Sequence, residues 1–302
     1  MAVEAESLTM GQWKITVVVA SHNARTSIAE CLSALVAQRP PEDVEIVVVD
    51  NSTDGTTEII RERFPDLRLI VSPPSTLIPQ LWGAGIQQSS GEVVALTTAH
   101  CIPDQDWLWQ VRKAHAAPAA AIGGVIENVA SAGVIDWAIY FCRYSRYMPP
   151  VREGVVAEIA GDNASYKRTY LERCQAAWRD GFWEPAVHAE LKKAGRSLLL
   201  APSIVISHKK SFRLLSFMRQ RFQHGRQFGA WRASCLPSRQ RALYIVLSPL
   251  IPFVLLARIG QQVLQKGRHC KAFVLSLPVL LLFLAAWTLG ELAGYLRGVK
   301  VH

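Results

Sequence analysis

Short β-branched runs that end in polar clusters constrain this fold more than any other feature. Such runs occupy residues 14–20, 44–50, 67–71 and 93–96 of the 302-residue chain, and segments with helical spacing of apolar residues lie between them at 26–38, 56–64 and 76–88. Strands and helices that alternate through short connections favour a parallel, doubly wound α/β sheet. Ligands of open α/β sheets bind at the carboxyl ends of the strands, so the polar residues after these runs are candidate site residues.

The segment from residue 103 to 210 is less regular. Its pattern predicts strands at 121–127 and 197–206, with helices at 107–117, 134–147, 167–176 and 185–194. Gly123-Gly124 inside the first of these strands indicates a close approach of another part of the chain. Gly195 follows the last helix and predicts its C-terminal cap.

Charge and hydropathy divide the chain near residue 208. Thirteen Lys and Arg and no acidic residue lie between Lys209 and Lys271, whereas the remainder holds 20 basic and 24 acidic residues. The basic stretch 209–241 is also rich in aromatic residues, which favours an amphipathic helix on anionic lipid. Basic charge beside apolar segments fits a membrane surface better than nucleic acid, so no nucleic-acid partner is expected.

Two uncharged segments, 242–257 and 272–290, are candidate membrane helices. As helices they would extend ~24 Å and ~28 Å, against a ~30 Å hydrocarbon core. The second predicts a transmembrane helix, whereas Pro249 and Pro252 make the first tilted, kinked or re-entrant. One or two crossings both satisfy the positive-inside rule, and a two-pass hairpin is favoured.

The N-terminus and the cysteines indicate the compartment. The first fourteen residues are acidic before they are apolar and lack a signal-peptide core. Six scattered cysteines without metal-binding spacing are typical of reduced thiols. We therefore expect a protein of the cytoplasmic (inner) membrane whose catalytic part faces the cytosol.

Five stretches, in order, resemble family 2 glycosyltransferases, the inverting enzymes with the GT-A fold. They are ITVVVASHN (15–23), VEIVVVDNSTDGT (44–56), GEVVALTTAHCIPDQDWL (91–108), GDNASYKR (161–168) and GFWEPAVHAELKKAGRSLLLAPSIVISH (181–208). The tail resembles the membrane anchor of bacterial members. The resemblance implies a Rossmann-like mixed α/β sheet with helices on both faces, followed by C-terminal membrane helices. The implied parts are a GT-A catalytic domain (12–210), a basic interfacial segment (211–241) and a membrane anchor (242–302).

The same resemblance implies roles for particular residues. Asp50 would accept a hydrogen bond from the nucleotide base, and Glu184 would be the catalytic base that takes the acceptor proton. The other residues on the nucleotide-sugar side would be Ala20, Ser21, His22, Asn23, Trp82 and Thr98. The acceptor or phosphate side would comprise Gly161, Asp162, Asn163, His188, His208, Arg221 and Arg226. Purely structural roles remain open: an Asx turn for Asp50, a helix N-terminal carboxylate for Glu184, and packing for His188.

Two departures from the family pattern concern the diphosphate. The metal-binding Asp-x-Asp is replaced by Thr98-Ala99-His100, and the segment with the phosphate-facing Arg reads Leu81-Trp82-Gly83-Ala84-Gly85. Imidazole suits Mn²⁺ better than Mg²⁺, so His100 is the candidate ligand of a divalent metal. Alternatively, His100, His208, Arg221 and Arg226 supply the positive charge without a metal.

The residues thus favour a membrane-anchored inverting glycosyltransferase. It would use a nucleotide-diphosphate sugar and a lipid, lipid-linked or polysaccharide acceptor. A non-catalytic nucleotide-sugar-binding relative, acting as a sensor or assembly partner, is the alternative that the lost Asp-x-Asp favours. A nucleotidyltransferase would need the missing carboxylates, and a dinucleotide-dependent oxidoreductase would need a G-x-G-x-x-G turn that neither early strand has.

Overall fold

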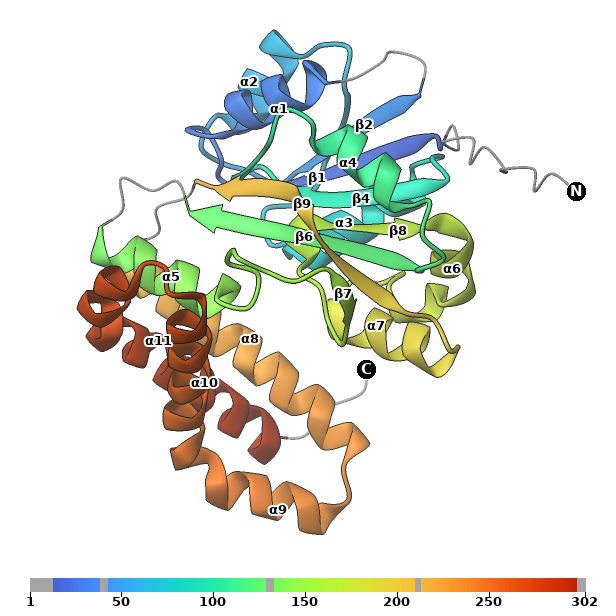
Figure 1. The fold of residues 1–302 in the computed structure, drawn as a ribbon. Helices are drawn as coiled ribbons and strands as arrows, with labels where there is room; N and C mark the ends of the chain where they lie inside the picture. The colour runs from blue at the N-terminus through green and yellow to red at the C-terminus, as the bar shows by residue number, and fades with distance from the viewer. Residues whose placement is uncertain (1–12, 39–42, 129–132, 210–212, 298–302) are drawn as a thin grey trace, which may run out of the picture. The chain divides into compact units, whose positions relative to one another are not determined.

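The computed structural model describes residues 13–38, 43–128, 133–209 and 213–297 (Figure 1). The chain forms two compact units, each of which is described here by itself. The first comprises Met1–Glu127 and Pro149–Lys209, and the second comprises Asn128–Met148 and Lys210–His302. The division after Lys209 lies where charge and hydropathy change along the sequence. That residues 128–148 join the second unit has no counterpart in the composition.

The first half of the sheet is parallel, as the strand–helix alternation predicts. Strands β1 (Ile15–Ser21), β2 (Val44–Asp50), β3 (Arg68–Val71) and β4 (Val93–Thr98) are connected by helices α1 (Ile28–Val36), α2 (Thr56–Arg63) and α3 (Ile78–Gln87). The register pairs Ser21 with Asp50 and Ala20 with Thr98. The predicted polar strand ends therefore meet at one edge of the sheet.

The second half of the sheet contains antiparallel strands, which the strand–helix alternation alone does not predict. The strand order is β3-β2-β1-β4-β8-β6-β9-β5, with β7 beside β9. The added strands are β5 (Cys101–Pro103), β6 (Ala121–Asn128), β7 (Gly154–Val156), β8 (Ala164–Lys167) and β9 (Leu198–His208). The resulting mixed sheet agrees with the predicted fold class.

Three of these strands have only three or four residues, too few to show a period of two. Their pairing with distant strands defines them. Strand β8 ends at Lys167, and the helix predicted at 167–176 is α6 (Arg168–Arg173) followed by the 3₁₀ turn η2 (Gln175–Ala177). Helices α4 (Trp107–Ala114) and α7 (Glu184–Lys193) complete the unit.

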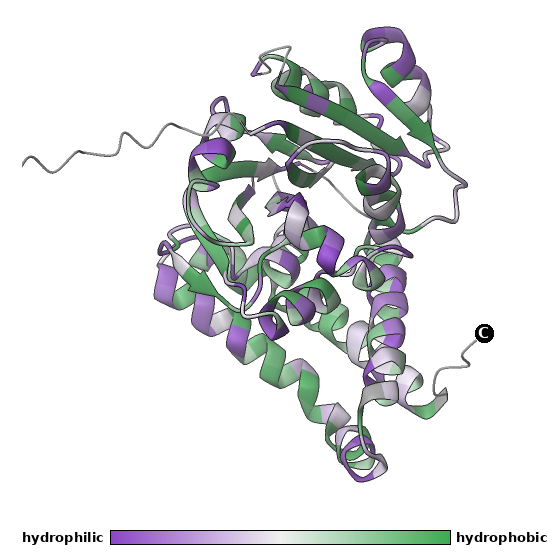
Figure 2. Cartoon of the chain, turned by 90° about the vertical axis from the view of Figure 1, so that its right-hand side faces the viewer, coloured by the Kyte–Doolittle hydropathy of each residue, from purple (hydrophilic) through white to green (hydrophobic). Residues whose placement is uncertain are grey.

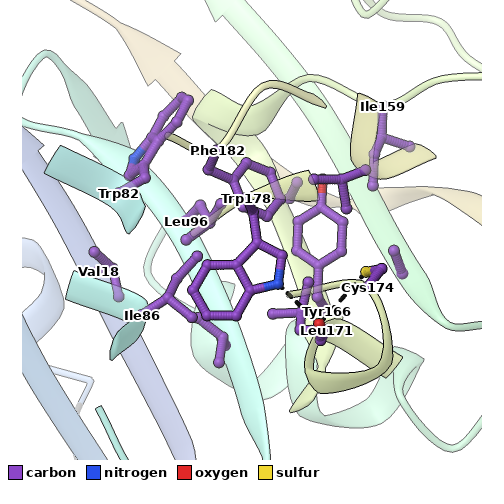
Figure 3. Packing of buried hydrophobic residues seen from close by; sticks show 14 of the residues in the cluster. Val18, Trp82, Ile86, Leu96, Ile159, Tyr166, Leu171, Cys174, Trp178 and Phe182 are labelled. Atoms are coloured by element: carbon purple, nitrogen blue, oxygen red, sulfur yellow. Dashed lines mark hydrogen bonds between the residues drawn. The ribbon is translucent and has the colours of Figure 1, made fainter. Parts of the chain in front are cut away.

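One face of the sheet is covered by a core rich in aromatic residues. Figure 3 shows Trp178, Phe182 and Tyr166 packed together, with Trp82 beside them. The indole of Trp178 donates a 2.8 Å hydrogen bond to the carbonyl of Leu171, so its buried N–H is satisfied. This core fixes the segments on both sides of α7, which begins at Glu184.

The predicted close approach at Gly123-Gly124 is confirmed. A Cβ atom on Gly124 would overlap the carbonyl oxygen of Ile204 and the side-chain amide of Asn163. Because the glycine leaves this space, the Asn163 amide donates to the carbonyls of Val125 (2.8 Å) and Ile204 (3.1 Å). Asn163 is thereby anchored at the end of the 3₁₀ turn η1 (Gly161–Asn163), and all three residues of this turn belong to the predicted site.

The second unit is helical in its described residues. It contains α5 (Val134–Tyr144), α8 (Leu214–Cys235), α9 (Ser238–Leu247), the 3₁₀ turn η3 (Ser248–Leu250), α10 (Ile251–Lys266) and α11 (Cys270–Arg297). The stretches 238–266 and 270–296 are long and apolar enough to cross a membrane by length and composition. Turn η3 lies where Pro249 and Pro252 predict a kink.

Candidate functional site

The loops after β1 and β2 are joined by side-chain hydrogen bonds. The Nδ1 atom of His22 lies 2.9 Å from Oδ1 of Asn51. The backbone N–H of Asn23 donates to the Ser52 hydroxyl at 2.8 Å, and the N–H of Thr53 donates to the Asn23 side chain at 3.0 Å. Because the two parallel strands end in register, these loops form one polar rim at the carboxyl edge of the sheet.

Asp50 lies at this rim but is fully buried. Its carboxylate accepts hydrogen bonds from hydroxyls of its own loop and of α2. Ser52 and Thr57 each donate a 2.5 Å hydrogen bond, one to each carboxylate oxygen. These two hydrogen bonds tie Asp50 to its own loop and to α2. Each carboxylate oxygen has a second lone pair that can accept a hydrogen bond from a nucleotide base. Recognition of the base by Asp50 therefore stays a prediction.

The side chains predicted to line the nucleotide differ in accessibility. Ala20 belongs to the hydrophobic core and Ser21 is fully buried, so neither residue is exposed at the rim. His22 is half-buried and Asn23 is exposed, with a positive φ of 48° that Asn tolerates in a turn. Within the predicted set, His22 and Asn23 are the side chains that the rim presents.

A carboxylate from a distant segment reaches the end of β4. The hydroxyl of Thr98 donates to Oδ1 of Asp162 at 3.1 Å, and both side chains are buried. The neighbouring Asn163 accepts a hydrogen bond from the Trp107 indole at 2.9 Å and is held by its own amide bonds. Asp162 is thus fixed at the strand end where the sequence lacks the expected carboxylates.

A second carboxylate lies beside the same turn. Glu184 is the first residue of α7, and its Oε1 atom accepts a hydrogen bond from the backbone N–H of Gly161 at 3.3 Å. Its side chain is half-buried. A Cβ atom on Gly161 would lie 2.7 Å from that oxygen and 2.9 Å from the Trp82 ring. Glu184 and Asp162 therefore flank one tightly packed glycine.

Comparison with known proteins identifies the family. The model described as "Glycosyl transferase family 2" matches residues 16–174, which is more than half of the chain. The chain belongs to glycosyl transferase family 2.

Two curated relatives support this membership. Glycosyltransferase AglE of Haloferax volcanii is 33% identical over 99 residues, which cover 31% of this chain and 33% of that protein. The second relative is a Methanococcus voltae protein named dolichyl N-acetyl-alpha-D-glucosaminyl phosphate 3-beta-D-2,3-diacetamido-2,3-dideoxy-beta-D-glucuronosyltransferase. It is 26% identical over 128 residues, which cover 38% of this chain and 40% of that protein. The chain thus spans well under half the length of each of these two relatives.

A solved structure shows the fold. The crystal structure of GalNAc-T7 with UDP, GalNAc and Mn²⁺ superposes with a TM-score of 0.53 at 14% identity, covering 67% of this chain and 44% of that chain. At this identity the likeness concerns the fold alone. It confirms the predicted GT-A architecture.

Trp82 does not replace the phosphate-facing Arg of family 2. Its indole N–H donates to the carbonyl of Thr97 at 2.9 Å, and its ring packs edge-on against Phe182 with centroids 6.5 Å apart. The side chain is 3% exposed. An indole is apolar apart from one N–H donor, so it is stable in the core once that donor is satisfied. The prediction of donor contact for the Trp82 side chain is therefore corrected to a packing role beneath Gly161.

His100 directly precedes β5, and His208 is the last residue of β9. His208 pairs with Cys101 in the sheet register, and both histidines are buried. The Nδ1 atom of His100 lies 3.1 Å from the Ser27 hydroxyl. Within the described ranges, no three His, Cys, Asp or Glu side chains gather closely enough to hold a metal ion. These residues therefore do not form a metal site by themselves.

The predicted phosphate-side residues of the helices have other surroundings. The Nε2 atom of His188 lies 2.9 Å from the Tyr166 hydroxyl, and its ring stacks on that tyrosine, so the side chain packs within the first unit. Arg221 belongs to the second unit, where its guanidinium lies 4.3 Å from the centroid of the Trp287 ring. Arg226, on the same helix, is exposed.

Burial of His188 predicts a loss of stability in acid. Burial, with a smaller contribution from Lys192, lowers the pKa of His188 from 6.5 to about 4. The unfolded imidazole binds a proton below pH 6.5 while the folded one stays neutral. The stabilisation is therefore complete above pH 6.5 and is lost as the pH falls towards 4, by up to about 3 kcal/mol.

Urea unfolding at pH 7 and at pH 5 measures this effect. We expect His188→Phe to reduce the difference in the free energy of unfolding between pH 7 and pH 5. Tyr166→Phe, which keeps the imidazole, should retain this difference. His115, whose pKa burial lowers to about 3, contributes in the same direction, so part of the difference persists. An unchanged difference in His188→Phe contradicts the assignment.

Proposed function

We propose that this protein transfers a sugar from a nucleoside-diphosphate sugar to a lipid or lipid-linked acceptor, with inversion at the anomeric carbon. The observation that carries the proposal is the convergence of Asp162 and Glu184 at the carboxyl edge of a family 2 sheet. The name of the Methanococcus voltae relative specifies a dolichyl-linked sugar phosphate, which supports a lipid-linked acceptor here. The apolar helices of the second unit support attachment to a membrane.

The proposed reaction requires a base on one side of the sugar and a leaving group on the other. Glu184 takes the proton of the acceptor hydroxyl, and the acceptor oxygen forms a bond to the anomeric carbon. The bond from that carbon to the diphosphate oxygen breaks, and the nucleoside diphosphate leaves with the electron pair. Attack from the face opposite the leaving group inverts the configuration.

The surroundings of Glu184 suit this role. The Gly161 N–H orients one carboxylate oxygen, and the half-buried position leaves the group accessible to an acceptor. Its place in the first turn of α7 stabilises the negative charge before the proton is taken up. We assign Asp162, held by Thr98, to the same site as a group that orients a sugar or acceptor hydroxyl.

Among the described residues, no three His, Cys, Asp or Glu side chains lie close enough together to hold a metal ion, so the steps proposed above use residues of the chain alone. The GalNAc-T7 structure contains Mn²⁺, and one or two carboxylates together with substrate phosphates can hold a divalent ion. Positive charge for the diphosphate would otherwise come from the protein, with His100 and His208 as the predicted candidates in the first unit. Inclusion of EDTA in the assay below separates the two routes.

Turnover of the donor by the detergent-purified full chain tests the function. Nucleotide-sugars are screened for release of nucleoside diphosphate, with a native lipid extract as acceptor and with or without EDTA. We expect release with one class of donor, and only when the acceptor extract is present. Tight nucleotide-sugar binding without release from any donor favours the sensor or assembly partner instead.

A further inference from the structure

We propose that the second unit lies within one leaflet of an anionic membrane and that neither of its two apolar stretches crosses the bilayer. This inference rests on the membrane attachment proposed above and specifies how the attachment is made. It replaces the predicted hairpin or single crossing. The contacts among the helices of this unit carry it.

The first apolar stretch is not one straight helix. Turn η3 separates α9, which has 10 residues, from α10, which has 16, and Figure 1 shows the two helices running in different directions from it. Alone they extend ~15 Å and ~24 Å, shorter than a ~30 Å hydrocarbon core. Neither helix by itself reaches across a bilayer.

The second apolar stretch, α11, is packed tightly against the basic helix α8. Cβ atoms on Gly225 and Gly229 of α8 would overlap the backbone of α11, and Cβ atoms on Gly290 and Gly294 of α11 would overlap the backbone of α8. Glycines on both helices thus bring the two backbones into direct contact. Any position of α11 in a membrane therefore also places α8.

The position of α8 along α11 argues against a membrane crossing by α11. The ring of Phe217, in the first turn of α8, meets the ring of Phe283 with centroids 4.6 Å apart. Phe283 is the midpoint of the candidate span Cys270–Leu296. If α11 crossed, the first turn of α8 would lie at the bilayer centre with its unsatisfied N–H groups. The exposed side chain of Arg219, two residues after Phe217 on α8, would enter the hydrocarbon, where charge is costly.

The beginning of α11 also has protein neighbours. The ring centroids of Trp137, in α5, and His269 lie 4.6 Å apart. Phe141 packs edge-on against Phe273, with ring centroids 5.4 Å apart. Helix α5 covers the first turns of α11, and α8 covers its C-terminal half. One side of α11 is therefore occupied by protein along much of its length.

The other side of α11 is apolar and open. Its exposed leucines are spaced by seven residues, which places them in one stripe along the helix. They are Leu275, Leu282, Leu289 and Leu296. The helices before it expose further large apolar side chains, namely Val246, Leu250, Phe253 and Leu264. Figure 2 shows such hydrophobic turns beside strongly hydrophilic ones on the helices of the chain.

The charge of the stretch from Lys209 to Lys271 indicates that the open side of α11 faces a lipid leaflet. Thirteen basic residues and no acid lie between Lys209 and Lys271, and a protein partner would not require this uniform sign. Anionic headgroups attract such a segment while the leucine stripe enters the acyl boundary. An in-plane orientation requires an apolar side and a basic polar side. The rigid pair of helices α8 and α11 has both.

Cysteine labelling in sealed vesicles decides between the orientations. In the full chain with Cys142, Cys235 and Cys270 replaced by Ser, one cysteine is introduced as Gln265→Cys near the α10–α11 turn, as Lys300→Cys in the tail, or as Lys193→Cys on α7. Each variant is reconstituted in vesicles of phosphatidylcholine and phosphatidylglycerol and labelled with a membrane-impermeant maleimide, before and after detergent. We expect all three cysteines to label from the same side and to the same extent.

The crossing alternatives give different patterns. A two-pass hairpin places Gln265→Cys on the side opposite to Lys193→Cys, and a single crossing of α11 places Lys300→Cys there; either pattern overturns the proposal. Self-association without flotation on the vesicles overturns it in favour of a protein partner. Donor turnover in detergent is independent of these outcomes, so a failure here is distinguishable from a failure of the proposed function.

A matched pair of substitutions tests the leucine stripe. Leu289→Arg puts a charge on the lipid side, and Gln223→Arg puts the same charge on the exposed polar side of α8. Binding to phosphatidylglycerol-containing vesicles is expected to weaken about tenfold or more for Leu289→Arg, since a buried leucine changes an equilibrium constant by at least that factor. Equal binding of the two variants contradicts the proposal.

Discussion

Replacement of Glu184 by Gln is expected to lower the rate of sugar transfer by at least ~100-fold, the scale of general-base catalysis. The amide keeps the size of the side chain and can still accept the Gly161 N–H bond through its oxygen. It cannot take a proton from the acceptor hydroxyl. Steady-state turnover of the purified chain measures the rate, and calorimetric titration with the donor measures binding. Binding should change little, because the base acts on the acceptor.

Glu190→Gln is the matched control. Glu190 lies on the same helix but is exposed, and its carboxylate pairs with Lys193 at the surface. An exposed ion pair of this kind contributes little, so turnover should stay near that of the wild type. If Glu184→Gln retains full turnover, Glu184 has only the structural role of a carboxylate at a helix N-terminus, and the base lies elsewhere.

Gly161→Ala is expected to lower the rate of transfer by about 100-fold, the effect of displacing a catalytic group by ~1 Å. The new methyl group would lie 2.7 Å from the Glu184 carboxylate oxygen and 2.9 Å from two ring carbons of Trp82. Neither the carboxylate nor the indole, which is held by Thr97, can stay in place. Overpacking of this kind costs about 1–3 kcal/mol of stability as well. Turnover and the melting temperature are measured together.

Two further variants separate misplacement of Glu184 from simple destabilisation. Gly133→Ala adds the same methyl group where the nearest atom is 3.8 Å away, and should leave turnover unchanged. Gly161→Ala combined with Trp82→Phe relieves the contact with the indole ring but not the contact with Glu184. We expect this double variant to retain low turnover. Full recovery of turnover would show that the glycine serves core packing alone.

The sequence was sufficient to predict the strands and the residues at their ends. Ser21, Asp50 and Thr98 each follow a run of β-branched residues, and parallel pairing brings such ends to one edge of a sheet. Glu184 could likewise be placed at the start of a helix, because the apolar spacing and the following Pro185 are local signals. Periodicity and turn chemistry depend on neighbours in the chain, so they can be read from it directly.

Only the tertiary structure placed the side chains that meet across the sheet. Asp162 reaches Thr98 because the four-residue strand β8 inserts beside β4, and so short a strand has no periodic signal. Trp82 points into the core and His188 bonds to Tyr166, although the family pattern predicted donor and phosphate contacts. Whether a side chain faces the core or the site depends on the space left by distant segments.

The same holds for the second unit. Hydropathy alone predicted one or two crossings from the apolar stretches, because it treats each helix as if it were alone in lipid. The glycines that join α8 to α11 place exposed arginines beside the apolar helix, which argues for the in-plane orientation. Composition determined that this part of the chain is apolar and basic. Helix packing determined which side of it is open, because close contact between backbones depends on the pairing of residues far apart in the chain.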